Sequence, residues 1–240
     1  MRRWKWCCTP LLCLAASLAP AALSAQTGQA PGVAAAGALG ITFEAKAVVV
    51  TGVSPHGQVV WLGVSREFPD GTPLVMRREG IAADADGSGT VRLALDGGVP
   101  ERSVWVVVDL STGASAAAPA PGYPRREITF SEAQEVYWGL NAAAGGVETI
   151  RDVRGLVDLL VVRPQAGAWG ARVGDGGPDD EDPAPGKLAT TLAHLHPVGA
   201  SPSPPASFRA GDVVVAIDPN RLSFSVWHLG QAPGPREGAR

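Results

Sequence analysis

The amino-acid sequence predicts an all-β protein, with a β-sandwich followed by a second β-rich domain. Between residues 90 and 96, Val91, Leu93 and Leu95 alternate with more polar neighbours, which is the period of a half-buried strand. Turns rich in glycine and proline separate such stretches. About six or seven strands fit within about seventy residues, a density typical of an antiparallel sandwich.

The N-terminus predicts a signal peptide over residues 1–25. Basic residues at Arg2 and Arg3 precede an apolar stretch at 11–23, and small residues lead to an expected cleavage site after Ala25. The apolar stretch is too short to span a bilayer stably. We therefore expect a secreted or periplasmic protein, with no transmembrane helix once this segment is removed.

Cysteine positions and charge indicate which disulfides and which partners the mature chain can have. The sequence has 3 cysteines, and Cys7, Cys8 and Cys13 all lie in the predicted signal peptide, so we expect no disulfide in the mature chain. The formal net charge is −3, and basic residues occur singly or in pairs. Nucleic acid is therefore not an expected partner, because no basic stripe follows the length of a phosphate backbone.

Changes in composition predict the domain boundaries. Residues 26–40 are small and polar and indicate a flexible linker, which is followed by the first sandwich at 41–112. The Pro/Ala/Gly-rich stretch at 113–124 indicates a second linker, the alternative being a long loop inside one domain. A second β-rich domain is expected at 125–229, and a disordered tail at 230–240.

Hydrophobic pattern and turn residues then place the individual strands. In the first domain, strands are expected at 41–51, 58–64, 74–78, 80–83, 90–96 and 103–110. In the second domain, strands are expected at 127–130, 153–162, 187–196, 212–218 and 222–229. Ser131 and Gln134 match a capping box, so one or two helical turns are expected from Ser131 through Trp138.

A short acidic turn follows the expected strand at 80–83. Asp84, Asp86 and Ser88 place oxygens at the first, third and fifth positions of a calcium loop, with Gly89 at the sixth. The twelfth position, where such loops carry a bidentate Glu, is Leu95. A β-turn whose Asp side chains accept backbone N–H groups accounts for the same residues, and we favour it over a calcium site.

This Asp-x-Asp-Gly turn resembles turns of secreted bacterial immunoglobulin-like modules. The resemblance covers residues 41–112 and also rests on Val53-Ser-Pro-x-Gly57 ahead of an apolar strand. It implies an immunoglobulin-like sandwich that serves as an interaction or spacer module. It implies no catalytic residue.

Two further groups of residues could bind metal. Asp175, Asp179, Asp180 and Asp182 form the densest charge run, which we interpret as a solvated loop with calcium as the alternative. His194 and His196 would share one face of a strand, as in a metal site. Two surface histidines need no metal, however, and the sequence nominates no general base beside them.

Trp138 and Trp169 each have glycine beside them and could present flat faces for stacking on sugars. Sandwich cores also use aromatic residues internally. The sequence contains no Gly-x-Ser-x-Gly nucleophile motif and no phosphate-binding loop.

We therefore expect a non-enzymatic interaction or structural module with a protein partner at the cell envelope, without a cofactor other than a possible Ca²⁺. A carbohydrate-binding module built on exposed tryptophans is one alternative. A metal-dependent hydrolase built on His194 and His196 is the other.

Overall fold

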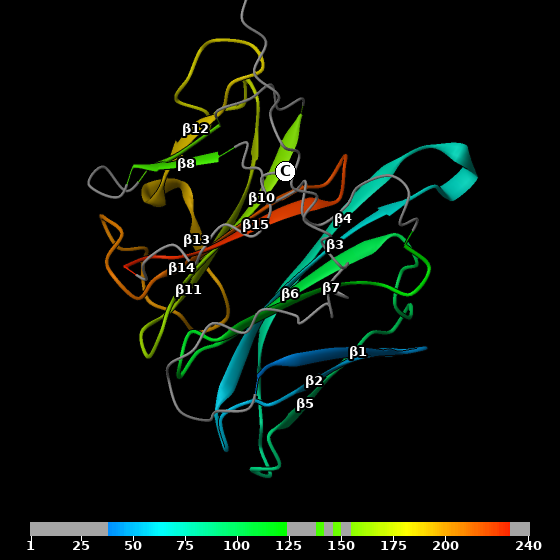
Figure 1. Ribbon diagram of the computed structural model, residues 1–240. Helices are drawn as coiled ribbons and strands as arrows, with labels where there is room; N and C mark the ends of the chain where they lie inside the picture. The colour runs from blue at the N-terminus through cyan, green and yellow to red at the C-terminus, as the bar shows by residue number, and fades with distance from the viewer. Residues whose placement is uncertain (1–37, 124–137, 142–145, 150–154, 231–240) are drawn as a thin grey trace, which may run out of the picture. The chain divides into compact units, whose positions relative to one another are not determined.

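The computed structural model describes residues 38–123, 138–141, 146–149 and 155–230, which form antiparallel sheets and two short 3-10 turns (Figure 1). The all-β class expected from the sequence is therefore confirmed. We call residues 38–123 the first half and residues 138–230 the second half. In these described residues, no helix is long and apolar enough to cross a membrane.

Two sheets of the first half pack face to face. One has the strand order β1-β2-β5 and the other has the order β4-β3-β6-β7. Buried residues of both sheets, among them Val48, Leu93 and Trp105, form a single apolar cluster. The elements are β1 (Gly40–Glu44), β2 (Ala47–Thr51), β3 (Gln58–Glu67), η1 (Pro69–Gly71), β4 (Leu74–Ala83), β5 (Thr90–Ala94), β6 (Ser103–Asp109) and β7 (Ser115–Pro119).

The second half contains a five-stranded sheet of order β13-β11-β10-β14-β15 and a three-stranded sheet of order β12-β9-β8. The elements are β8 (Trp138–Asn141), β9 (Gly146–Thr149), β10 (Leu156–Arg163), β11 (Gly167–Gly174), β12 (Ala189–Thr191), η2 (Leu192–His194), β13 (His196–Pro197), β14 (Val213–Asp218) and β15 (Ser223–His228). Leu188, Leu192 and Phe208 pack on one face of the five-stranded sheet.

The four-stranded and five-stranded sheets share an apolar core. Leu62 and Val106 of the first half belong to the same buried cluster as Leu160 and Val215 of the second half. Both sheets are therefore covered on two faces. Every residue of β6 and of β14 is buried, which explains why these strands are continuous apolar runs rather than alternating ones.

The linker predicted at 113–124 contains a strand. β7 pairs with β6 over five residues, from Val104 opposite Pro119 to Val108 opposite Ser115. Its sequence, Ser-Ala-Ala-Ala-Pro, has little hydrophobic signal and matches a linker in composition. Residues 115–119 form a strand because they pair with the open edge of β6, and backbone pairing does not require large side chains.

Other elements also differ from their expected bounds. The strand expected at 41–51 is the hairpin of β1 and β2, and the strands expected at 74–78 and 80–83 form the single strand β4. β11 lies where the sequence predicts no strand. Trp138, expected to end a helical turn, begins β8.

Several expected segments lie outside the described residues. They are the signal peptide at 1–25, the linker as far as residue 37, the strand at 127–130, the helical residues 131–137 and the tail from residue 231.

Gly63 of β3 provides a test of how closely the first core is packed. It pairs with Trp105 of β6, and a Cβ added at Gly63 would lie 2.6 Å from the Trp105 ring. We expect Gly63→Ala to lower the free energy of unfolding by about 1–3 kcal/mol, because the ring must move within a filled core. Urea denaturation measures this change.

Gly97→Ala is the matched control, since a Cβ there would meet nothing within 4 Å. We expect its effect to stay within about 0.5 kcal/mol. Equal urea midpoints for Gly63→Ala and Gly97→Ala would contradict the close packing of Trp105 on β3.

Candidate functional site

Two buried carboxylates organise the loop between β2 and β3. The Oδ2 atom of Asp109 accepts the Ser54 N–H at 2.8 Å, and the Oδ2 atom of Asp84 accepts the His56 N–H at 3.2 Å. Asp84 and Asp109 are each 1% exposed. The loop is therefore held by ionisable groups that are themselves fixed at the ends of β4 and β6.

Asp109 also fixes the turn that follows β6. Its Oδ1 atom accepts the N–H groups of Ser111 at 2.7 Å and Thr112 at 3.1 Å. Burial by itself raises the pKa of Asp109, but the hydrogen bonds from Ser54, Ser111 and Thr112 outweigh it, so the pKa lies below its ordinary value of 3.8. The carboxylate is thus stabilised in its charged form.

These two segments form one wall of a cleft of about 680 Å³, which we call the loop cleft. Its second wall comes from the turn between β10 and β11 and from residues 199–201 after β13. The backbone N–H of Gln165 donates to the Leu110 carbonyl at 2.7 Å, which joins the walls across the two halves. Polar lining groups are contributed by His56, Gln58, Ser111, Gln165 and Ser201.

Two lining residues of the loop cleft have left-handed backbone conformations. His56 has φ 55° and Gln165 has φ 61°, whereas such values are ordinary for glycine. Each costs about 1–3 kcal/mol and persists where surrounding contacts fix it. Here the contacts are the Asp84 carboxylate at His56 and the Leu110 carbonyl at Gln165. Strained residues of this kind are typical of binding sites.

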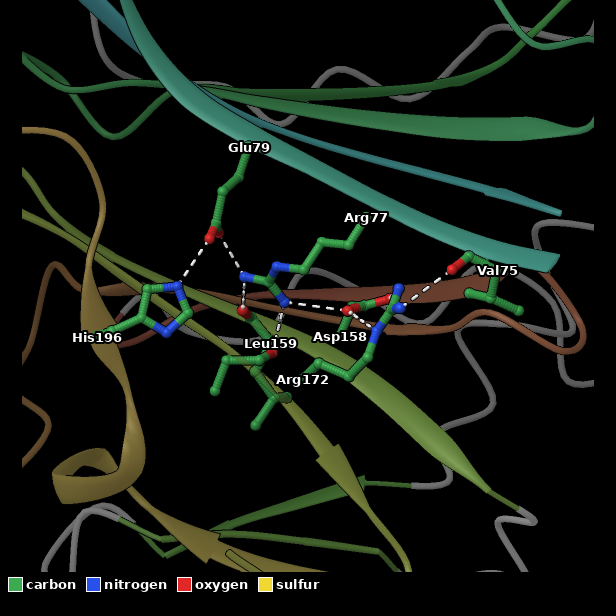
Figure 2. Close-up of polar contacts among 8 residues, drawn as sticks. Val75, Arg77, Glu79, Asp158, Leu159, Arg172 and His196 are labelled. Carbon is green, nitrogen blue, oxygen red and sulfur yellow. Dashed lines mark hydrogen bonds and ion pairs between the residues drawn. The ribbon is translucent and has the colours of Figure 1, made fainter. Parts of the chain in front are cut away.

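A buried ion network lies where β4 faces the five-stranded sheet (Figure 2). Arg77 of β4 donates to the Asp158 carboxylate at 3.1 Å and to the Leu159 carbonyl at 3.0 Å. It also contacts Glu79 and the Ala171 carbonyl. The guanidinium therefore bonds to two neighbouring strands of the opposing sheet.

Asp158 is the fully buried centre of this network. Its side chain is 0% exposed and accepts two hydrogen bonds from Arg172, at 2.9 and 2.8 Å, in addition to the one from Arg77. Arg172 also donates to the Val75 carbonyl at 3.2 Å. A buried carboxylate requires such pairing, because its removal from water costs several kcal/mol. Loss of one partner of a buried ion pair lowers the free energy of unfolding by about 3–5 kcal/mol.

Gly170 makes room for this network on β11. A Cβ at Gly170 would overlap both the Arg77 guanidinium and the Glu79 carboxylate. At the exposed end of the network, the Nε2 atom of His196 lies 2.8 Å from the Oε1 atom of Glu79 (Figure 2). His196 lies three residues before Gly199, where the lining of the loop cleft begins.

The structure places Asp84, Asp86 and Ser88 in one loop, where their oxygens accept or share hydrogen bonds with the protein. Asp84 also accepts the Gly89 N–H at 2.9 Å and the Ser88 hydroxyl at 3.3 Å. Asp86 accepts the Ser88 N–H at 3.0 Å. These bonds are those of the β-turn alternative, and they explain how the turn holds His56.

In the acidic loop at residues 174–186, Asp side chains also accept backbone N–H groups. Asp175 accepts the Gly186 N–H at 2.9 Å, Asp182 accepts the Ala184 N–H at 2.9 Å, and Asp180 accepts three backbone N–H groups. Asp179 lies half-buried in this loop. Across the described parts of the chain, no group of three or more His, Cys, Asp or Glu side chains is placed to hold a metal ion.

The expectation that His194 and His196 share one face of a strand is wrong. The segment expected as a strand turns at η2, which contains His194, and β13 begins only at His196. The His194 Nδ1 atom lies 3.2 Å from the Thr190 hydroxyl, whereas His196 contacts Glu79. The two imidazoles therefore have different partners. The contact of His196 with Glu79 could not be predicted from the sequence, because the two residues are 117 positions apart.

Trp169 does not present a flat face to solvent, which the sugar-stacking alternative requires. Its side chain is 2% exposed, and its Nε1–H donates to the Pro202 carbonyl at 2.6 Å. Trp138 belongs to β8, but its side chain lies outside the described residues.

No protein-family model, curated protein or solved structure matches this chain. The candidate site therefore rests on the geometry of the chain itself.

Asp158→Ala tests the buried network. We expect this substitution to lower the free energy of unfolding by about 3–5 kcal/mol, because it leaves two partly buried guanidinium groups without their carboxylate. Glu44→Ala is the control, since Glu44 and its partner Arg92 are 52% and 56% exposed. That exposed pair should contribute less than about 1 kcal/mol. Similar losses in the two variants, measured by urea denaturation, would contradict the assigned role of Asp158.

Asp109→Asn tests the carboxylate that shapes the loop cleft. Because the pKa of Asp109 is lowered on folding, its stabilising contribution is present above pH 3.8 and is lost as the pH falls through the folded-state value. The difference in unfolding free energy between the wild type and Asp109→Asn should therefore be about 1–3 kcal/mol near pH 7 and shrink below about pH 4. Urea denaturation at several pH values measures it, and a constant difference would refute the assignment.

Proposed function

We propose that this chain is an exported, non-enzymatic binding module that holds a protein partner at the cell envelope. The observation that carries this proposal is the loop cleft, in which segments from both halves meet and two non-glycine residues have left-handed conformations. A preformed cleft binds with little loss of conformational entropy. Export is supported by the N-terminal sequence pattern at residues 1–25.

The chemistry of the lining favours an uncharged, polar peptide segment as the ligand. The described lining residues include no Asp, Glu, Lys or Arg, while Gln58, Ser111 and Gln165 offer amide and hydroxyl groups. Ile81 and Leu110 add apolar surface. Peptide backbone and small polar side chains match this mixture, whereas sugar sites commonly add an aromatic platform, and Trp169 is buried elsewhere in the core.

The arrangement of the first half supports an immunoglobulin-like relationship as part of this proposal. Seven strands are divided between the sheets β1-β2-β5 and β4-β3-β6-β7. This order corresponds to strands A-B-E facing C′-C-F-G of an immunoglobulin-like sandwich. Modules of this architecture commonly use the loops at the ends of their strands for binding.

Ala200→Trp tests the proposal by filling the loop cleft. Peptides are selected with the full chain from a displayed random library, and their affinities are then compared between variants. We expect the selection to yield uncharged polar peptides. Their affinity should fall at least about tenfold in the Ala200→Trp variant, because the indole occupies the space of the ligand. Isothermal titration calorimetry measures the affinities.

Ala94→Trp is the matched control, because Ala94 is also an exposed alanine but lies on β5, away from the lining of the loop cleft. Its affinities should equal those of the wild type. Peptides that bind Ala200→Trp as tightly as Ala94→Trp, or a selection that yields only charged peptides, would refute the proposed ligand and site.

A further inference from the structure

A second cleft, of about 530 Å³, lies between the outer end of the β3–β4 hairpin and residues 97–102 before β6. We call it the arginine cleft, because Arg66, Arg78 and Arg102 all line it. It shares no lining residue with the loop cleft. Its lining is highly charged, whereas that of the loop cleft contains no carboxylate, lysine or arginine.

An exposed phenylalanine lies against two of these arginines. The guanidinium carbon of Arg66 is 5.3 Å from the centre of the Phe68 ring, and that of Arg102 is 5.0 Å from the same point. Phe68 is 41% exposed, so part of its ring is open to solvent and to a ligand. Contact with the ring restricts where both guanidinium groups can lie. The Nε atom of Arg66 is buried and its Nη1 atom donates to the Asn220 carbonyl, so Arg102 offers more N–H groups to a ligand than Arg66 does.

Carboxylates within the arginine cleft do not neutralise it. Arg78 lies 3.4 Å from Glu67, but the ion pairs among the described residues do not include Arg102. The Arg66 guanidinium donates one hydrogen bond to the Asn220 carbonyl at 2.9 Å and also interacts electrostatically with the Asp218 carboxylate, so the charge of Arg66 is partly compensated. Among the lining residues, three guanidinium groups face two glutamates, Glu67 and Glu101, and Arg102 supplies the positive charge that no carboxylate of the described residues pairs with.

We infer that the arginine cleft binds an oxyanion, a carboxylate or a phosphate, that is attached to a nonpolar group. Arginine recognises both oxyanions through paired N–H groups, and such bonds are strong because both partners are charged. Phe68 supplies the adjoining apolar surface for the rest of the ligand. This site is independent of the proposed peptide binding in the loop cleft.

Calorimetric titration of the full chain with phenyl phosphate, benzoate and inorganic phosphate tests this inference. At least one of the aromatic anions should bind at least about fivefold more tightly than inorganic phosphate, because only the aromatic anions contact Phe68 as well as the arginines. The comparison of phenyl phosphate with benzoate identifies which oxyanion is preferred. Raising the salt concentration should weaken binding of each.

Variants locate the binding. We expect Arg102→Gln and Phe68→Ala each to weaken binding of the preferred aromatic anion at least about fivefold, and Arg102→Lys to have a smaller effect because it keeps the charge but not the planar fork. Arg92→Gln removes an exposed arginine on β5 and should leave the affinity unchanged. Thermal melting confirms that each variant is folded before titration.

Three results would overturn the inference. They are the absence of binding by both aromatic anions, equal affinities for inorganic phosphate and the aromatic anions, and a loss on Arg92→Gln equal to that on Arg102→Gln. Should Arg102→Gln fail to fold, Phe68→Ala and Arg102→Lys decide the result, since neither removes a charge.

Discussion

The burial of the Asp158 carboxylate is the constraint on which the association of the two halves depends. A buried charge is tolerated only when it is paired, and its partners come from β4 of the first half and β11 of the second half. Apolar surface drives the two sheets together but does not define their relative position, because the hydrophobic effect is non-directional. The hydrogen bonds of Arg77 and Arg172 are directional and favour one stacking of the sheets.

The position of both candidate sites depends on this stacking. The loop cleft lies between the two halves, and the arginine cleft lies at the outer end of the β3–β4 hairpin, which carries Arg77. The loop cleft has one wall from each half, so its shape depends on the position of β4 over the five-stranded sheet. Buried carboxylates then set the individual loops, with Asp84 and Asp109 accepting backbone N–H groups. Asp84 thus acts as an acceptor that shapes a loop, which is why the turn at Asp84 resembles a cation site in sequence.

The sequence predicted the fold where side-chain pattern decides the structure. The apolar runs in β6 and β14 were identifiable because both faces of these strands are buried. β7 and β11 were missed, because alanine and glycine carry little hydrophobic signal, and Gly170 is required by a guanidinium from another sheet. The contacts within the sites could not be predicted from the sequence either. Pairs such as Glu79 and His196 are separated by 117 residues, and their contact depends on how the sheets stack.

The separation of Arg77 from Asp158 along the chain has a consequence for biosynthesis. The two residues are 81 positions apart, and ribosomes add about 5–20 residues per second, so Arg77 waits about 4–16 seconds for its partner to be synthesised. During that interval the face of β3 and β6 that later packs on the five-stranded sheet has no cover. In the order of synthesis, the apolar face of the first half is therefore complete before the sheet that covers it, and it is open to other apolar surfaces until the second half folds against it.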